Sequence, residues 1–200
     1  MAEHPEDRPR RADAERNRAA IIEAAVTCLS ADPRASMADI AQAAGVGRLT
    51  LYGHFSSRRE LIDAIVEQTM REAEAQLAPL SMEGDPTQAL ELLVTTSWQV
   101  LVRSHGVLTA AEQELGQDGI RHHHDQTMRR VGRLIQRGQA EGAFRSDLSA
   151  AWFTACFFAL LHGASAEIRA GRMDEREAAS AVSTTIAALV AVPETASRPA

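Results

Sequence analysis

Residues 37–56 read MADIAQAAGVGRLTLYGHFS, and this stretch decides the fold of the N-terminal part of the chain. Two short helices that meet at about 90–120° need a small residue where they approach and a turn residue that tolerates the left-handed conformation. Ala41 supplies the first and Gly45 the second. The apolar positions that lock the helices together are Ile40, Ala44, Val46 and Leu51. The pattern predicts a helix-turn-helix, with Phe55 closing its small core.

Helices are also expected on both sides of this stretch. Residues 12–30 repeat apolar residues at helical spacing and predict a preceding helix. Ser36 stands at an N-cap position with Asp39 three residues on, which predicts a capping box where the first helix of the motif begins. Ser56 or Ser57 can cap the helix that follows the motif.

The last helix of the motif, expected over residues 47–54, distinguishes two interpretations. A generic helical hairpin inside a bundle explains the apolar spacing equally well. It does not explain why the exposed positions can donate to phosphates or bases, these being Arg48, Thr50, Tyr52 and His54. Their chemistry favours DNA binding.

The charges of the chain are unevenly divided. The formal net charge is −6. Residues 8–59 hold nine arginines against five acidic residues, whereas residues 60–200 hold twelve against nineteen. A basic segment joined to an acidic body is typical of a protein that neutralises phosphates. The charge distribution therefore agrees with DNA binding by the N-terminal part.

The order of residues across the motif resembles that of the tetracycline-repressor (TetR) family of regulators. The resemblance covers about residues 14–65 and rests on four short runs, Ile40-Ala41, Ala44-Gly45-Val46, Thr50-Leu51-Tyr52 and His54-Phe55. Arg58 occupies the position where the family usually has lysine at the start of its fourth helix. An unrelated hairpin would rarely reproduce both the turn glycine and this order. Beyond the motif, the chain matches the family only in helix count and in the loose pattern of residues 138–148.

The resemblance implies which residues meet DNA. Thr50, Tyr52 and His54 would contact the backbone or the bases, and Arg48 would be the best reader of a base edge. Arg58 is expected to anchor a phosphate. Phosphate contacts are also expected from three residues whose alternative role is a solvated face, namely Arg16, Arg18 and Ser36.

Three positions depart from the family's pattern. Gly47 stands where members usually cap the third helix with Ser or Thr, and Gly53 removes a side chain that often assists with phosphates. Leu49 replaces a usually small residue and would either contact a thymine methyl group or simply pack. These departures bear on the operator sequence rather than on DNA binding itself.

Almost the whole chain is expected to be helical, because no run alternates apolar and polar residues with β-branched enrichment. The expected fold is all-α with about nine helices. An N-terminal three-helix helix-turn-helix DNA-binding domain precedes a C-terminal helical bundle for ligand binding and dimerisation. The expected segments are a disordered tail at 1–11, the DNA-binding domain at 12–60, a connecting helix and loop at 61–84, the bundle at 85–193 and a second disordered tail at 194–200.

The sequence predicts neither secretion nor a membrane span. The first eleven residues are charged and contain proline, and the longest apolar stretch, residues 150–161, is too short to cross a bilayer. Cys28 and Cys156 lie in apolar helical patterns and are expected to be buried thiols in a reducing compartment. The expected location is the cytoplasm, without a membrane partner.

The C-terminal half is expected to bind a small ligand and a second copy of the chain. In the family the last two helices usually pair with those of the dimer mate, and the alanine-rich residues 175–192 suit close approach. An apolar cavity with a few polar groups is the usual shape of a ligand site. Plain core packing is the alternative for any single aromatic residue. The candidate ligand-binding residues are Trp98, Leu101, His105, Met128, Trp152, Cys156 and His162.

Three consecutive histidines, residues 122–124, suggest a metal site at first sight. Successive helical residues point about 100° apart and cannot converge on one ion, so a surface histidine cluster is expected instead. Neither a metal nor a cofactor is predicted. The leading interpretation is a homodimeric repressor that binds a palindromic DNA operator and is released by a small, largely apolar inducer.

A small helical-bundle enzyme and a non-specific structural DNA-binding protein are the alternatives. An enzyme would need a nucleophile–base pair or a convergent carboxylate–histidine site, and no such spacing occurs in the sequence. A structural DNA-binding protein would not need so large an apolar C-terminal domain. The chain is therefore expected not to be an enzyme.

Overall fold

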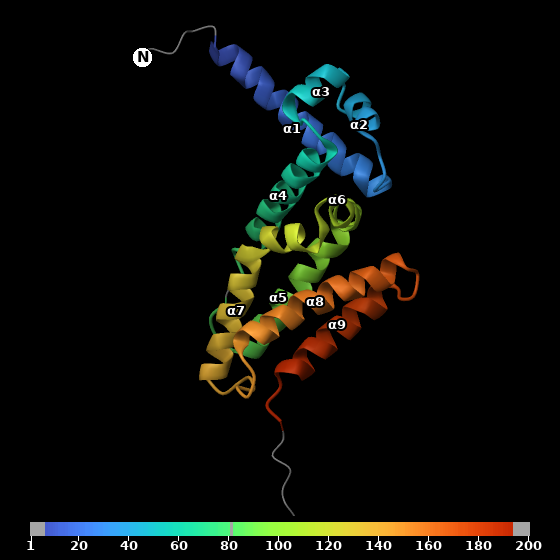
Figure 1. The fold of residues 1–200 in the computed structure, drawn as a ribbon. Coiled ribbons are helices and arrows are strands. Elements are labelled where there is room, and N and C mark those ends of the chain that lie inside the picture. Colours follow the sequence, from blue (N-terminus) through green and yellow to red (C-terminus); the bar gives the residue numbers. More distant parts are fainter. Residues whose placement is uncertain (1–6, 81, 194–200) are drawn as a thin grey trace, which may run out of the picture. The chain divides into compact units, whose positions relative to one another are not determined.

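The structure is a computed structural model that describes residues 7–80 and 82–193. These residues form nine helices and no strand, which confirms the predicted all-α fold (Figure 1). The helices are α1 (Asp7–Ala31), α2 (Met37–Ala43), α3 (Arg48–His54), α4 (Arg58–Leu77), α5 (Pro86–Arg103), α6 (His105–His123), α7 (Asp125–Ala140), α8 (Ala150–Arg169) and α9 (Glu175–Val190).

The first helix begins earlier than the sequence predicted. Residues 7–11, expected within a disordered tail, form the first turns of α1. The N–H groups of a first helical turn have no intrahelical partner, so Pro9 removes no hydrogen bond there. The rest of that expected tail, residues 1–6, and the expected tail at 194–200 lie outside the described residues.

The chain divides into two compact units that do not follow sequence order. Residues 7–70 and 104–123 form unit 1, and residues 71–103 and 124–193 form unit 2. The helix α4 begins in unit 1 and ends in unit 2. The helix α6 belongs to unit 1, although its residues lie within the segment 85–193 that was expected to form the C-terminal bundle.

In unit 1, α1 is the central helix, and α2, α3 and α6 all pack against it. Ile22 and Leu29 of α1 are buried together with Leu51 of α3. The helix α6 approaches α1 closely at Gly106, where an added Cβ would lie 2.2 Å from the carbonyl oxygen of Leu29 and 2.7 Å from Cα of Ser30. Any larger residue would force these two backbones apart.

A break divides α6 into two segments at Gly116, which has φ 72° and ψ 177°. Glycine adopts this left-handed φ without the steric penalty that a side chain brings. The break leaves carbonyl groups at the end of the first segment without helical partners. One of them, the carbonyl of Glu114, accepts a hydrogen bond from Nη1 of Arg59 at the start of α4.

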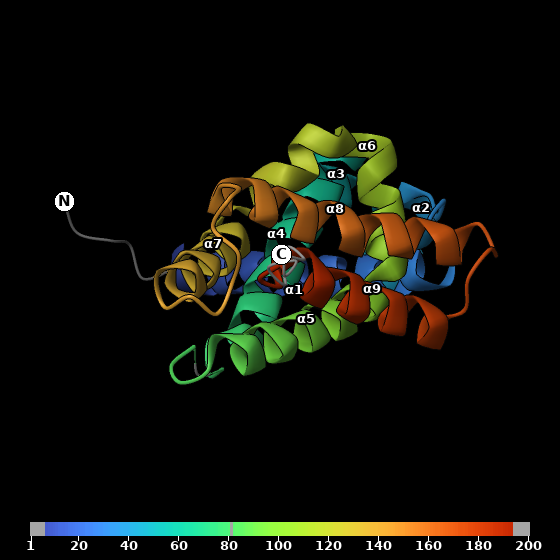
Figure 2. The same cartoon turned by 90° about the horizontal axis from the view of Figure 1, so that it is seen from below.

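Unit 2 is a bundle of α5, α7, α8 and α9, joined by the end of α4. Both views draw α8 and α9 side by side (Figures 1 and 2). The largest buried side chains of its core are Trp98, Phe144, Phe153 and Phe157. Gly138 allows the ring of Phe144 to pack directly on α7, since an added Cβ would lie 2.1 Å from that ring.

A largely buried ion pair fixes α7 to the end of α4 within unit 2. Nη2 of Arg130 lies 3.0 Å from Oε2 of Glu74, and the two side chains are only 15% and 12% exposed. Arg130 also donates to the carbonyl oxygen of Leu77 at 3.1 Å, and the Thr127 hydroxyl donates to Glu74 at 2.6 Å. These contacts pair the two charges, although the buried Nε of Arg130 has no hydrogen-bond partner.

By length and composition alone, α8 is the one described helix that could cross a membrane. It is longer than the apolar stretch of residues 150–161 that the sequence suggested, because the helix continues to Arg169. Phe153, Phe157 and Leu161 of α8 lie in the buried core of unit 2, and 28% of the apolar window of the helix is buried in this way. Cys156 on α8 and Cys28 on α1 are free thiols and half-buried, not fully buried as predicted.

Candidate DNA-binding interface

The start of α2 is fixed by the predicted capping box. The hydroxyl of Ser36 accepts a hydrogen bond from the N–H of Asp39 at 3.2 Å, and the N–H of Ser36 donates to the Asp39 carboxylate at 2.8 Å. The hydrogen bonds from Ser36, with a smaller contribution from the charge of Arg48, lower the pKa of Asp39. The first turn of α2 is therefore held at neutral pH by a carboxylate that stays ionised.

The turn between α2 and α3 also has the predicted geometry. Gly45 has φ 67°, and the N–H of Val46 returns to the carbonyl oxygen of Ala41 at 3.0 Å. Gly47 is the N-cap of α3 and provides no side-chain cap, as expected from its departure from the family pattern. Leu51 is the buried residue of α3, so its packing fixes the rotation of that helix.

The rotation of α3 leaves one side of the helix open. Arg48, Leu49, Thr50 and Tyr52 are exposed, and His54 is half-buried. Leu49 is 90% exposed and therefore does not pack against the rest of unit 1, while its contact with a thymine methyl group stays a prediction. Polar donors on an exposed helix of a helix-turn-helix are the arrangement that reads a DNA groove.

The other expected contacts lie around this helix. Ser36 is exposed at the start of α2, and Arg16 and Arg18 are exposed on α1. The guanidinium of Arg18 lies 5.2 Å from the ring centroid of Phe55, a cation–π contact that orients it. Arg16 forms an exposed ion pair with Asp13. Their contacts to phosphates stay predictions.

Arg58 has a role inside unit 1 that the sequence did not suggest. Its Nε donates to Oε1 of Glu114 on α6 at 2.9 Å, and its Nη2 donates to the carbonyl oxygen of Pro33 at 2.9 Å. Its Nη1 donates to the carbonyl oxygen of Ala35, the residue before the N-cap of α2. Arg58 thus ties α4, α6 and the loop that precedes α2 together. A phosphate contact by this residue stays a prediction.

The start of α4 is capped by the pair of serines that the sequence singled out. The hydroxyl of Ser57 accepts from the N–H of Glu60 at 3.2 Å, while the N–H and hydroxyl of Ser56 donate to the Glu60 carboxylate. The hydrogen bonds from Ser56, together with the charge of Arg18, lower the pKa of Glu60. This second cap places Arg58 in the first turn of α4.

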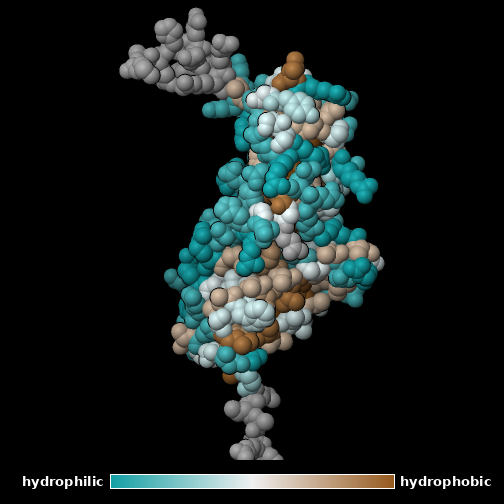
Figure 3. Space-filling view, in the orientation of Figure 1, coloured by the Kyte–Doolittle hydropathy of each residue, from teal (hydrophilic) through white to brown (hydrophobic). Residues whose placement is uncertain are grey.

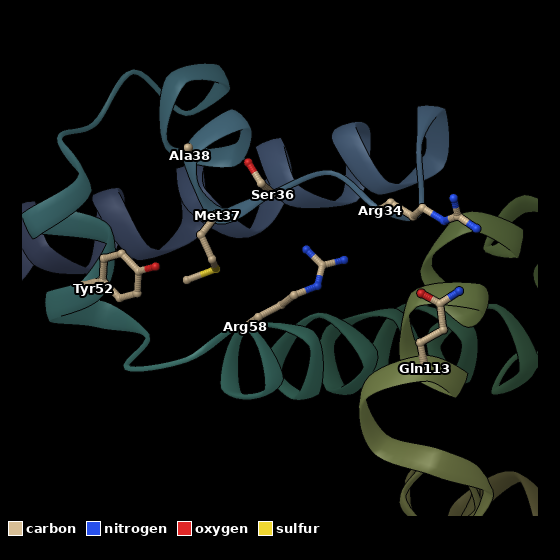
Figure 4. A pocket seen from close by; sticks show the side chains of 7 residues that line it. All are labelled: Arg34, Ser36, Met37, Ala38, Tyr52, Arg58 and Gln113. Atoms are coloured by element: carbon tan, nitrogen blue, oxygen red, sulfur yellow. The ribbon is translucent and has the colours of Figure 1, made fainter.

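A hollow of about 500 Å³ lies between these elements of unit 1 (Figure 4). The guanidinium of Arg58 lies in its middle, with Met37 to one side and Gln113 of α6 to the other. Its lining residues are Arg34, Ser36, Met37, Ala38, Tyr52, Arg58 and Gln113. Three residues of this region, Arg34, Gln113 and Glu114, were not predicted from the sequence. The only sequence signal at Arg34 is the positive charge that it shares with the other arginines of its segment. No local sequence pattern predicts that residues 113 and 114 pack in unit 1.

The candidate ligand residues are not all brought together. Trp98 is buried in the core of unit 2 and Leu101 packs at its edge. Met128, Cys156 and His162 are half-buried in the same unit. Trp152 is 56% exposed on α8, and His105 belongs to α6 in unit 1.

His162 is part of a compact cluster of rings in unit 2. Its ring lies 4.1 Å from that of Phe158, and His124 meets both rings edge-on at centroid distances of 5.0 and 5.2 Å. Burial, and then the nearby charges of His124 and Arg169, lower the pKa of His162 to about 4. His162 is therefore neutral at pH 7 and offers one donor and one acceptor nitrogen.

The three consecutive histidines do not form the expected surface cluster, because only His122 is exposed while His123 and His124 are half-buried. His123 lies 2.9 Å from Asp63 in unit 1, whereas His124 contacts the rings of Phe158 and His162 in unit 2. Across residues 7–80 and 82–193, no three or more His, Cys, Asp or Glu side chains gather as a metal site would require.

A helix-turn-helix whose reading helix exposes an arginine, a threonine and a tyrosine, joined to a separate helical bundle, defines a DNA-binding regulator. Residues 21–65 match the family described as bacterial regulatory proteins, tetR family. This match, together with relatives that are transcriptional regulators, supports the resemblance to TetR-family transcriptional regulators that the sequence motif predicted.

Two characterised relatives agree with this assignment. The chain is 28% identical over 157 residues to the HTH-type transcriptional regulator NfxB of Pseudomonas aeruginosa, which covers 76% of this chain and 82% of NfxB. It is 35% identical over 75 residues to the HTH-type transcriptional repressor LfrR of Mycolicibacterium smegmatis, which covers 38% of this chain and 40% of LfrR. The relatives confirm the prediction of a regulator and not an enzyme.

Solved structures show the same fold. The TetR-like regulator LfrR from Mycobacterium smegmatis, in complex with proflavine, has a TM-score of 0.65 at 23% identity, over 90% of this chain and 98% of LfrR. The regulator FadR from Bacillus subtilis, in complex with stearoyl-CoA, has a TM-score of 0.70 at 16% identity, over 86% of this chain and 98% of FadR.

Proposed function

We propose that this regulator is a cytoplasmic repressor that binds a palindromic operator as a homodimer. A small, largely apolar molecule bound in unit 2 releases it from the DNA. The observation that carries the proposal is the exposed side of α3, whose orientation is held by the buried Leu51 and by the turn at Gly45.

Arg48 is the proposed base reader on this surface. It is exposed in the first turn of α3, and an arginine can donate two hydrogen bonds to the O6 and N7 atoms of guanine. Thr50, Tyr52 and His54 lie on the same short helix and offer hydroxyl and imidazole groups to the backbone or the bases. Arg16, Arg18 and Ser36 are proposed to anchor phosphates beside it.

Selection of binding sites from random DNA duplexes, followed by fluorescence anisotropy at several salt concentrations, tests the proposal. We expect a palindrome whose half-sites are about 34–36 Å apart, or a multiple of that distance. Arg48→Ala should weaken the selected site roughly 5- to 150-fold, the equivalent of losing one bidentate base contact. The control is Arg103→Ala, which removes an exposed arginine from α5 and should change affinity by no more than about twofold.

Equal affinity for every duplex would identify the protein as a non-specific structural DNA-binding protein instead. Loss of preference at one position of each half-site in Arg48→Ala would support the assignment of the base reader. If Arg48→Ala weakens binding to all DNA sequences equally, Arg48 contacts a phosphate and does not read a base.

The surface of α8 and α9 supports the homodimer. Every exposed residue of α9 from position 180 onward is uncharged, and α8 exposes Ala159 and Gly163 beside the half-exposed Trp152. Tan and brown surface gathers in Figure 3 where Figure 1 draws these two helices. Small residues allow two helix pairs to approach closely, and a large aromatic residue is a typical centre of an interface.

Sedimentation at micromolar concentration tests the dimer. Trp152→Arg is expected to shift the protein toward the monomer and to weaken operator binding, since a monomer reaches only one half-site. Leu92→Arg is the matched control. Leu92 is 44% exposed on α5, so this substitution introduces the same charge on a different helix. A wild-type protein that is monomeric and still binds a palindrome tightly would contradict the proposal.

The ligand is proposed to bind in unit 2 near Trp98 and the neutral His162. A neutral imidazole offers hydrogen bonds without the cost of burying a charge, which suits a largely apolar ligand. Two structural neighbours hold ligands with large apolar parts, proflavine and stearoyl-CoA, and so support this class. Leu101, Met128 and Cys156 are the remaining proposed lining residues in this unit.

Proflavine titration measured by tryptophan fluorescence tests the ligand site. The chain has two tryptophans, so Trp152→Phe leaves Trp98 as the single reporter. Saturable quenching that also lowers operator affinity is expected. Quenching that leaves operator affinity unchanged would contradict release by a ligand of this class, and absence of quenching at saturating probe would contradict a site for planar ligands near Trp98.

A further inference from the structure

The recognition helix carries an apolar side chain at its most open position. Leu49 is 90% exposed, the most of any large hydrophobic residue in the described part of the chain. Leu49 stands two residues before Leu51 in α3. Side chains two positions apart in an α-helix point about 200° apart around the helix axis, which is almost opposite. Because Leu51 is fully buried against the rest of unit 1, Leu49 is fixed on the opposite side of α3.

The neighbours of Leu49 leave room for a base edge to approach. Gly53 follows one turn later on the same side of α3, and a Cβ added there would have no heavy atom within 4 Å. Tyr52, the other neighbour on this side, is 50% exposed. Leu49, Tyr52 and Gly53 therefore share one uncharged side of α3, and the single hydrogen-bonding side-chain group among them is the tyrosine hydroxyl.

A DNA major groove offers one apolar group to such a surface. Guanine, cytosine and adenine present hydrogen-bond donors and acceptors, whereas thymine also presents its C5-methyl group. A leucine pressed against a donor or acceptor would leave that group without a partner, which disfavours the other bases. The methyl group instead gains from contact with leucine by excluding water from both.

We propose that Leu49 is a specificity-determining residue that reads the C5-methyl group of a thymine in each half-site of the operator. The inference rests on the proposed function, since it assumes that α3 enters the major groove of a specific DNA site. It adds the chemistry of one base position, which the family assignment does not give.

Replacement of thymine by uracil tests this proposal, because uracil pairs identically and lacks only the C5-methyl group. The duplex selected by the wild-type protein is prepared with uracil at one thymine position at a time, changed in both half-sites. At one position the wild-type protein is expected to lose about three- to tenfold in affinity per methyl group, near the transfer value of a single buried carbon. Uracil at the other positions should change affinity by less than about twofold.

The variant Leu49→Ala tests whether the leucine side chain is the group that recognises the methyl group. It should bind the thymine duplex more weakly and should no longer distinguish thymine from uracil at that position. Because Leu49 is exposed, the variant should keep the wild-type circular dichroism spectrum and melting temperature. Leu92→Ala removes an exposed leucine from α5 and should keep the wild-type preference for thymine.

The outcomes separate this inference from the proposed function. A wild-type protein that selects no specific duplex overturns both. A protein that selects a palindrome but is indifferent to every thymine-to-uracil change, or a Leu49→Ala variant that still distinguishes the two bases, overturns only the assignment of Leu49.

Discussion

Arg58→Ala is the substitution that best tests how unit 1 is held together. The guanidinium donates to the Glu114 carboxylate and to two backbone carbonyl groups before α2, and the side chain is only 23% exposed. A hydrogen bond that involves a charged group contributes about 1.5–3 kcal/mol when it is lost, and an exposed ion pair contributes about 0–1 kcal/mol. With partial exposure taken into account, we expect the free energy of unfolding to fall by about 2–4 kcal/mol.

Calorimetry or circular dichroism measures the effect directly. A loss of 1 kcal/mol lowers the melting temperature of a chain of this size by about 2–4 °C, so Arg58→Ala should lower it by about 4–16 °C. Glu114→Gln should have a smaller effect, because the amide oxygen still accepts a hydrogen bond but carries no charge. Arg16→Ala removes an exposed arginine from the same unit and should lower the melting temperature by no more than about 4 °C.

The salt dependence of operator binding distinguishes the two roles of Arg58. A phosphate anchor contributes about one unit to the slope of log affinity against log salt, whereas an internal tie contributes nothing to it. An Arg58→Ala protein with unchanged melting temperature and a flatter salt slope would refute the internal role and restore the phosphate contact that the sequence suggested.

Three further substitutions probe the two units. Gly106→Ala should lower the melting temperature by several degrees because its Cβ would collide with the backbone of α1, whereas Gly132→Ala, whose Cβ would meet its nearest atom at 3.4 Å, should not. Arg130→Ala should destabilise unit 2 by about 3–5 kcal/mol, since it leaves the carboxylate of Glu74 buried without its partner; unchanged urea unfolding would contradict this. His162 binds its proton more weakly in the folded protein than in the unfolded chain, so stability should fall as the pH drops from about 6.5 to about 4, by at most about 3 kcal/mol. His162→Gln should remove this part of the pH dependence, and an identical profile would count against it.

The features that sequence predicted are those fixed by neighbours along the chain. The capping box joins Ser36 to Asp39, and Gly45 alone provides the left-handed turn, so a window of a few residues contains all the information. The same holds for the burial of Leu51 and the exposure of Arg48, which follow from helical periodicity.

The features that sequence did not predict depend on residues far apart in the chain. Arg58 reaches Pro33 and Glu114, which are 25 and 56 residues away. The apolar pattern around His105 resembles that around Trp98, yet the two residues belong to different units. Periodicity identifies which face of a helix is buried but not which helix covers it.

The return of α6 to unit 1 limits how regulators of this architecture can exchange parts by recombination. A hybrid gene that joins residues 1–70 of this protein to the remainder of a distant relative would keep α1, α2 and α3 but replace Glu114 and Gly106. The new head would keep the acceptor for Arg58 and the close approach of α6 to α1 only if the relative has an acidic residue and a glycine at the equivalent positions. An exchange that carries residues 104–123 along with the N-terminal helices preserves both contacts, so the part of the chain inherited with the DNA-binding helices is not a single continuous segment.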